Sequence, residues 1–280
     1  MGFFQDIAVN PLLLSGLAAG LLAGLTCGVI GPFVVTRRIV FLCGAIAHMA
    51  VGGIGAAIFL RHFFPGLFDW LDPFHGAVAA AVAGAVSIGI AEEIAGERMD
   101  TLIGAMWAIG MAVGILLVRY TPGYHTELMS YLFGNISVVR WIDVGRLLIM
   151  ATIVVAAVAL YYKRLLAFSI DEEHARLQGI EPLRLNILLL VLVALTVVSL
   201  MQIVGLILVI ALITLPAATV GHHVHRLGPM IVGAVALSAL LTTVPRIAAY
   251  GSGVSPEAAI VLTAGLIYLV SVVVKRLRDT

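Results

Sequence analysis

The chain has 280 residues, of which 62% are hydrophobic and only 11% are charged, and its formal net charge at pH 7 is +1. The hydrophobic share lies well above the apolar share of about 45–50% in soluble domains. The mean hydropathy is also high, at +1.14. These values exclude an ordinary soluble protein, and the scattered charges exclude a nucleic-acid partner. We predict an all-α integral membrane protein, a polytopic helical bundle that forms a single domain over residues 1–280.

Apolar runs of about 20 residues, the length that a helix needs to cross a hydrocarbon core of about 30 Å, recur along the sequence. Nine membrane spans are predicted: 12–35, 40–60, 76–95, 101–119, 145–163, 183–200, 203–220, 228–249 and 257–274. The run 183–220 is divided near Met201, Gln202 and Gly205. Without that division the chain would have eight spans.

The basic residues predict the orientation, because short cytoplasmic loops of membrane proteins are enriched in Lys and Arg. With the amino terminus outside, five of the 16 basic residues lie in outer loops: Arg61, Arg119, Arg140, Arg146 and Arg246. The other eleven lie on the inner side: Arg37, Arg38, Arg98, Lys163, Arg164, Arg176, Arg184, Arg226, Lys275, Arg276 and Arg278. The carboxyl terminus is therefore expected in the cytoplasm.

One predicted cytoplasmic loop contains its own short helix. In LLAFSIDEEHARLQGIEP, Ser169 is expected to cap a helix whose first turn holds Asp171, Glu172 and Glu173, and Gly179 is expected to end it. A helix at about 169–180 is too short to span a membrane. It suits docking to a partner protein, and a solvated surface helix is the alternative.

The same segment is the first of five that resemble segments of a known family. FSIDEEHARLQGI resembles the coupling helix of type II ABC importer permeases. Four more segments are similar, in the correct order, to signatures of the ABC-3 family of zinc, manganese and iron uptake permeases: TRRIVFLCGAIAH, MDTLIGAMWAIGMAVG, YLFGN and LILVIALITLPAAT. The resemblance implies a multi-pass permease of the bacterial cytoplasmic membrane that moves a divalent transition metal ion inward by alternating access, with no permanently bound cofactor.

The resemblance also implies partners. They are two copies of an ABC ATPase subunit, a second copy of this permease and an extracytoplasmic metal-binding protein. The residues expected to contact the ATPase are Ser169, Asp171, Glu172, Glu173, Ala175, Arg176 and Gly179. The sequence has no G-x-x-x-x-G-K-S/T phosphate loop, so ATP hydrolysis is expected in a separate chain, and this chain is not an enzyme.

His48 is the first candidate for the metal path. Gly44, His48, Gly52 and Gly55 follow spacings of four, four and three, which place them on one helical face. An ionisable side chain inside a span usually faces a bundle interior or an aqueous path. The alternative is an imidazole bonded to a carbonyl of a neighbouring helix. Many ABC-3 relatives have Asp four residues before this histidine, whereas this chain has Gly44, so a site poor in negative charge is expected.

Two further groups are candidates at the inner ends of spans. His222, His223 and His225 follow LITLPAAT and could bind an ion that leaves the path, or could instead form a basic interfacial helix end. Glu92 and Glu93 could form an electronegative vestibule, or could simply extend into water.

Two rival functions remain open at this stage. A type II ABC permease for a chelate such as haem, a siderophore or cobalamin would share the coupling helix. A secondary cation transporter would need carboxylates near the bilayer midplane, and the centres of the predicted spans contain none.

Overall fold

The computed structural model describes residue 6, residues 10–95, 98–122, 134 and 139–278, and every regular element among them is a helix. The chain divides into two compact units. Unit 1 contains residues 1–38, 134–162 and 203–280, and unit 2 contains residues 39–133 and 163–202. Each unit therefore combines segments that are distant in the sequence.

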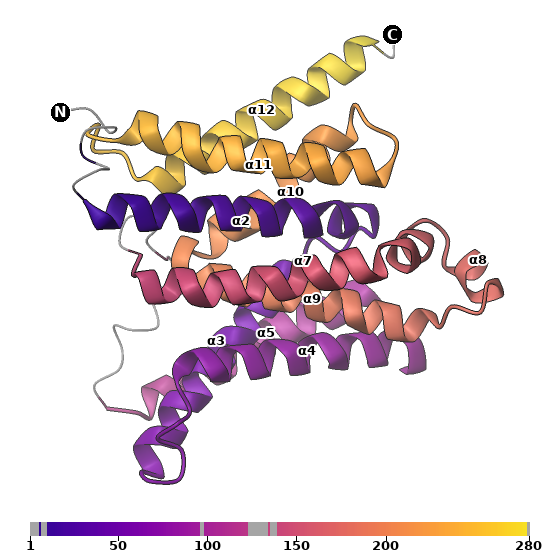
Figure 1. Cartoon of the computed structure of the whole chain (residues 1–280). Helices are drawn as coiled ribbons and strands as arrows, with labels where there is room; N and C mark the ends of the chain where they lie inside the picture. The colour runs from indigo at the N-terminus through magenta and orange to yellow at the C-terminus, as the bar shows by residue number, and fades with distance from the viewer. Residues whose placement is uncertain (1–5, 7–9, 96–97, 123–133, 135–138, 279–280) are drawn as a thin grey trace. The chain divides into compact units, whose positions relative to one another are not determined.

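Unit 1 is built from α2 (Pro11–Thr36), most of α7 (Trp141–Ile170), α10 (Leu206–Gly221), α11 (Leu227–Ala249) and α12 (Pro256–Arg278). Helix α11 lies alongside α2 (Figure 1). Their backbones come close at two small residues of α2, because a β-carbon at Gly24 would lie 3.0 Å from the backbone nitrogen of Ala239 and one at Gly28 would collide with Val235. Small residues commonly permit such approach between membrane helices.

Unit 2 contains α3 (Leu42–Phe63), α4 (Pro73–Ala95), α5 (Met99–Arg119), the end of α7, the short α8 (Glu172–Leu177) and α9 (Pro182–Val204). Helix α3 packs against both α4 and α5. In the described part of the chain, eight helices are long and apolar enough to cross a membrane, and α10, with 16 residues, is shorter. The prediction of a polytopic helical membrane protein is confirmed.

Proline and asparagine mark where several helices begin. Asn10 caps α2, with its side-chain oxygen accepting a hydrogen bond from the Leu12 amide at 3.0 Å. Helices α4, α9 and α12 each begin with proline, which lacks an amide hydrogen that the first turn would leave unpaired in any case. These local signals set helix ends that composition alone locates only roughly.

The predicted break in the run 183–220 is confirmed. Helix α9 ends at Val204 and α10 begins at Leu206, with Gly205 between them at a φ of 79°. Gly134 approaches this break so closely that a β-carbon on it would collide with the backbone of Gly205. Only glycine meets both requirements, a left-handed backbone and no side chain. Helix α10 continues through Pro216 without a break.

The predicted start of the short helix at about 169–180 is wrong. Ser169 does not cap it, because α7 continues to Ile170 and Ser169 is buried in its last turn. Asp171 is the cap instead, and its carboxylate accepts a hydrogen bond from the His174 amide at 2.9 Å. Gly179, at a φ of 76°, follows the helix as expected. Figure 1 shows α8 beyond the end of α7.

We predict that Gly53→Ala destabilises unit 2. A β-carbon at Gly53 would collide with the Gly76 carbonyl of α4, a backbone atom that cannot move aside. The free energy of unfolding should fall by about 1–3 kcal/mol, the usual cost of overpacking. Gly104→Ala is the control, since no atom lies within 4 Å of its β-carbon position. Thermal unfolding in detergent should show a loss for Gly53→Ala and none for the control; equal melting temperatures would contradict the prediction.

Candidate metal path and ATPase contact

His48 lies in α3 with only 9% of its surface exposed. Its ring stacks on the indole of Trp107 in α5, with ring centroids 4.9 Å apart and an angle of 27° between the planes. The Nδ1 atom is buried and has no hydrogen-bond partner among the described residues. A buried polar atom without a partner costs about 1–3 kcal/mol, so this nitrogen is available to a ligand.

Glycines on both helices bring the His48 backbone against α5. A β-carbon at Gly110 would lie 2.7 Å from the carbonyl carbon of His48, and one at Gly52 would lie 2.9 Å from the Gly110 carbonyl oxygen. One turn further on, Gly55 and Gly114 approach each other in the same way. His48 therefore occupies a seam where two backbones are in direct contact.

The structure explains why position 44 is glycine. A β-carbon at this position would lie under 3.0 Å from two ring carbons of Trp107. The indole thus fills the space, one turn before His48, that a side chain at position 44 would use. Trp107 is the important residue that the sequence reasoning missed. Its spacing of three and seven residues to Gly110 and Gly114 was the available signal, because it matches the small-residue face of α3.

The two glutamates at the end of α4 contact neighbouring elements of unit 2. The Glu93 carboxylate accepts a hydrogen bond from the Arg176 guanidinium of α8 at 3.1 Å, and Glu92 accepts one from the Asn186 amide of α9 at 2.8 Å. The side chains of Arg176 and Glu93 are 61% and 36% exposed, so this pair contributes at most about 1 kcal/mol. It positions α8 more than it stabilises the fold.

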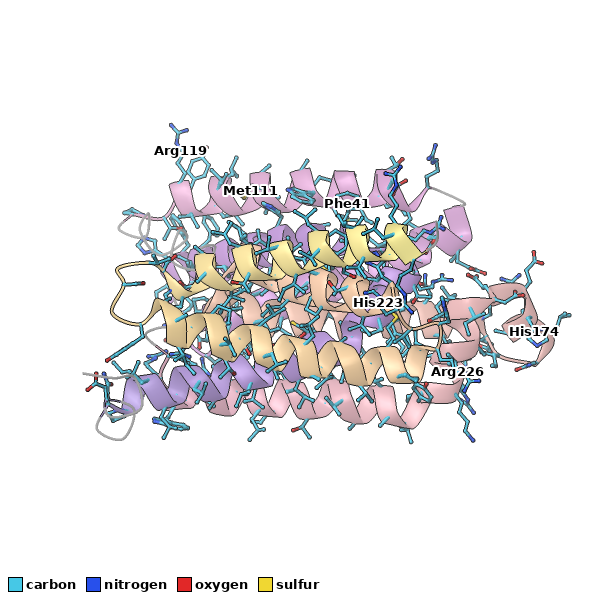
Figure 2. The ribbon with its side chains drawn as sticks, turned by 90° about the horizontal axis from the view of Figure 1, so that it is seen from above. Phe41, Met111, Arg119, His174, His223 and Arg226 are labelled. Carbon is cyan, nitrogen blue, oxygen red and sulfur yellow. The ribbon has the colours of Figure 1, made fainter. Side chains whose placement is uncertain are left out.

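Helix α8 presents polar and apolar groups to its surroundings. Ala175 is fully buried, whereas Leu177 is 86% exposed and Ile170, at the end of α7, is 72% exposed. His174 lies on the same short helix (Figure 2). Exposed large apolar side chains beside charged ones are typical of protein contact surfaces.

The three histidines after α10 divide into a pair and a separate residue. His222 Nδ1 and His223 Nε2 each lie 3.0 Å from the hydroxyl oxygen of Ser271 in α12, and His225 is exposed. Burial lowers the pKa of His222, and the positive charges of Lys275 and His223 lower it further. The imidazole of His222 is therefore held toward its neutral form.

No group of three or more His, Cys, Asp or Glu side chains in the described part of the chain is arranged to hold a metal ion. His62 and His75, which the predicted spans place in outer loops, are exposed. His125 and residues 130–133 also fall in a predicted outer loop, and they lie outside the described residues. A conduit must release its ion as well as bind it, and sparse ligands suit that requirement.

A family model described as the ABC 3 transport family matches residues 10–275. The chain belongs to this family. Membership confirms the resemblance found in the sequence. It also confirms that this chain is a transport subunit and not an enzyme. An uncharacterised membrane protein of Synechocystis is 37% identical over 262 residues, which cover 94% of this chain and 90% of that protein.

Two further relatives carry functional names. The manganese transport system membrane protein MntC of Listeria monocytogenes is 31% identical over 271 residues, covering 97% of this ABC 3 chain and 93% of that protein. The solved structure of PsaBC from Streptococcus pneumoniae in complex with Fab contains a chain 28% identical, with a TM-score of 0.82 and coverage of 96% and 94%. The bacterial relatives and the apolar helices confirm a multi-pass protein of the bacterial cytoplasmic membrane.

We predict that Gly44→Ala displaces the Trp107 indole from His48 in this ABC 3 chain. The added methyl group collides with the ring, and the stability loss should be about 1–3 kcal/mol. Combining it with Trp107→Leu should cost less than the sum of the single changes, because the collision is then absent. A double-mutant cycle of denaturant unfolding, with tryptophan fluorescence as a second readout, measures this. Strict additivity would show that the two residues do not interact.

Proposed function

We propose that this chain is the permease through which a divalent transition metal ion enters the cytoplasm, driven by a separate ATPase. The observation that carries the proposal is His48, a buried imidazole with an unpartnered nitrogen in the middle of a predicted span. Imidazole is a borderline ligand for zinc, iron and, less tightly, manganese, whereas calcium and magnesium prefer oxygen. The transported ion is the substrate, and it binds transiently.

Manganese is the first ion to test. The Listeria relative is named for manganese transport, and so is the manganese import system permease protein ScaB of Streptococcus gordonii, 29% identical over 273 residues. A single imidazole does not by itself select among manganese, iron and zinc. Because Trp107 occupies the space near Gly44, no carboxylate joins His48 from that position, and we expect weak binding at this point of the path.

Unit 2 offers a continuous route from the proposed ATPase contact to His48. Arg176 of α8 pairs with Glu93 of α4. Helix α4 in turn packs on α3, where a β-carbon at Gly84 would lie 3.2 Å from Met49, the residue after His48. We propose that closure of the two ATPase subunits moves α8 and that α4 carries this movement to α3. An extracytoplasmic binding protein and a second permease copy complete the transporter.

The rival functions receive less support. A secondary transporter would couple transport through buried carboxylates, and Glu92 and Glu93 lie instead at the end of α4 with Asn186 and Arg176 as partners. The match of the ABC 3 transport family model to residues 10–275 favours metal-ion uptake over a chelate permease. ATP-dependent uptake of a free ion separates both rivals from the proposal.

We expect His48→Ala to lower uptake of the transported ion by more than about tenfold, because even partners of metal ligands typically matter by this amount. Cells that express the permease with its ATPase and binding protein are tested with radioactive manganese, zinc and iron. His75→Ala is the matched control, since His75 is exposed at the start of α4. Normal uptake by His48→Ala would return this residue to a packing role, and no uptake by the wild type would favour the chelate.

We expect Leu177→Glu to weaken ATPase docking by about tenfold, or ~1.4 kcal/mol, without loss of folded protein, because Leu177 is 86% exposed. The measurement is transport-coupled ATP hydrolysis and co-purification of the ATPase. Leu67→Glu is the control, since Leu67 is 66% exposed in a loop predicted on the opposite side of the membrane. Equal effects of the two changes would remove α8 from the docking surface.

A further inference from the structure

Two imidazoles converge on one hydroxyl where the chain leaves α10. The rings of His222 and His223 are nearly perpendicular, with centroids 6.4 Å apart. Their Nδ1 and Nε2 atoms both lie 3.0 Å from the oxygen of Ser271, which is 6% exposed in α12. Figure 2 labels His223 in this position.

The hydrogen-bonding capacity of Ser271 is fully used by this arrangement. A hydroxyl has one hydrogen and two lone pairs. Its oxygen lies 3.3 Å from the Thr219 carbonyl, which can only accept. With the hydrogen directed there, both imidazoles must present N–H groups to the lone pairs. The Thr219 hydroxyl beside this carbonyl is itself buried and has no hydrogen-bond partner in the described structure.

We propose that His222, His223 and Ser271 form a second, weak binding site for a divalent transition metal ion of the zinc class. The ion replaces the two N–H hydrogens that face the hydroxyl. Each neutral imidazole shifts its hydrogen to the other ring nitrogen, so no net proton is released. Imidazole nitrogens bind zinc at about 2.0–2.1 Å, and water completes the open positions.

The charges around the pair suit an ion in passage. A neutral imidazole is the form that ligates a metal ion. The positive charge of Lys275 acts on His222, so it also repels a bound cation and keeps its affinity low. The inference takes its class of ion from the proposed transport function, and by the usual affinity order the pair should favour zinc over manganese.

The place of the pair in the fold supports an exit role. Tyr162 of α7 approaches the start of α11, since a β-carbon at Gly228 would lie 2.9 Å from its hydroxyl oxygen. Tyr162 lies eight residues before Ile170, where α7 ends, so the start of α11 lies near the carboxyl-terminal end of α7. The pair therefore lies on the side predicted to be cytoplasmic.

The experiment uses the complex of permease and ATPase in detergent, in a His48→Ala background that removes the proposed path ligand. Equilibrium dialysis measures binding of zinc and manganese, and the absorption bands of cobalt report nitrogen ligands. His222→Ala and His223→Ala should each weaken zinc binding by more than about tenfold. His225→Ala, an exposed histidine of the same segment, should leave it unchanged.

Ser271→Ala separates a metal site from a contact that only holds α10 to α12. It removes the hydroxyl and keeps both imidazoles, so zinc binding should persist within a fewfold. Unchanged zinc binding after loss of His222 or His223, or an equal loss in His225→Ala, would overturn the inference. If cells with the wild-type transporter take up the metal while the pair binds no zinc, this inference alone fails. If the pair binds zinc while cells with the wild-type transporter take up no metal, the proposed function alone fails.

Discussion

Direct contact between helix backbones is the constraint on which unit 2 depends. In a bilayer, lipid tails solvate apolar side chains as well as another helix does, so helices associate through close van der Waals packing and not through exclusion of water. Helix α3 makes such close contacts on two sides. Gly53 packs against Gly76 of α4, and Gly52 packs against Gly110 of α5. His48 is carried into the second contact because it lies one turn before Gly52 and its backbone faces Gly110. Its burial, its stacking on Trp107 and its unpartnered nitrogen all follow from how closely α3 and α5 approach.

The sequence predicted the helices well because the bilayer imposes their length, and it located the break at Gly205 because glycine interrupts an otherwise apolar run. It also placed His48 on the small-residue face of α3. It could not show which helix that face meets, since one sequence contains the face and not its partner, and Trp107 was therefore missed. At the short helix, Ser169 and Asp171 are both good caps. The burial of Phe168 and Ser169 keeps α7 helical through this point, which leaves Asp171 as the cap.

Charged side chains in this protein act mainly at the ends of helices. Glu92 and Glu93 were considered for an ion vestibule, and in the structure each has a partner on another element of unit 2. Because the Arg176 and Glu93 side chains are substantially exposed, their attraction is screened by water and contributes little to stability. A weak contact at this position still has a mechanical consequence. If α8 moves when the ATPase closes, as proposed, this contact links its movement to that of α4.

Contacts at helix ends also constrain α10 in unit 1. Its 16 residues span about 24 Å at 1.5 Å per residue, which is less than a hydrocarbon core of about 30 Å. A helix that is too short for the bilayer needs other elements to fix both of its ends. At one end the backbone of Gly134 contacts Gly205, and at the other His222 and His223 meet Ser271 of α12. Any displacement of α12 along its axis therefore reaches α10 through this hydroxyl as well as through the packing of the two helices. A metal ion bound there would strengthen that connection, so occupancy at the end of the path and the position of α10 are physically linked.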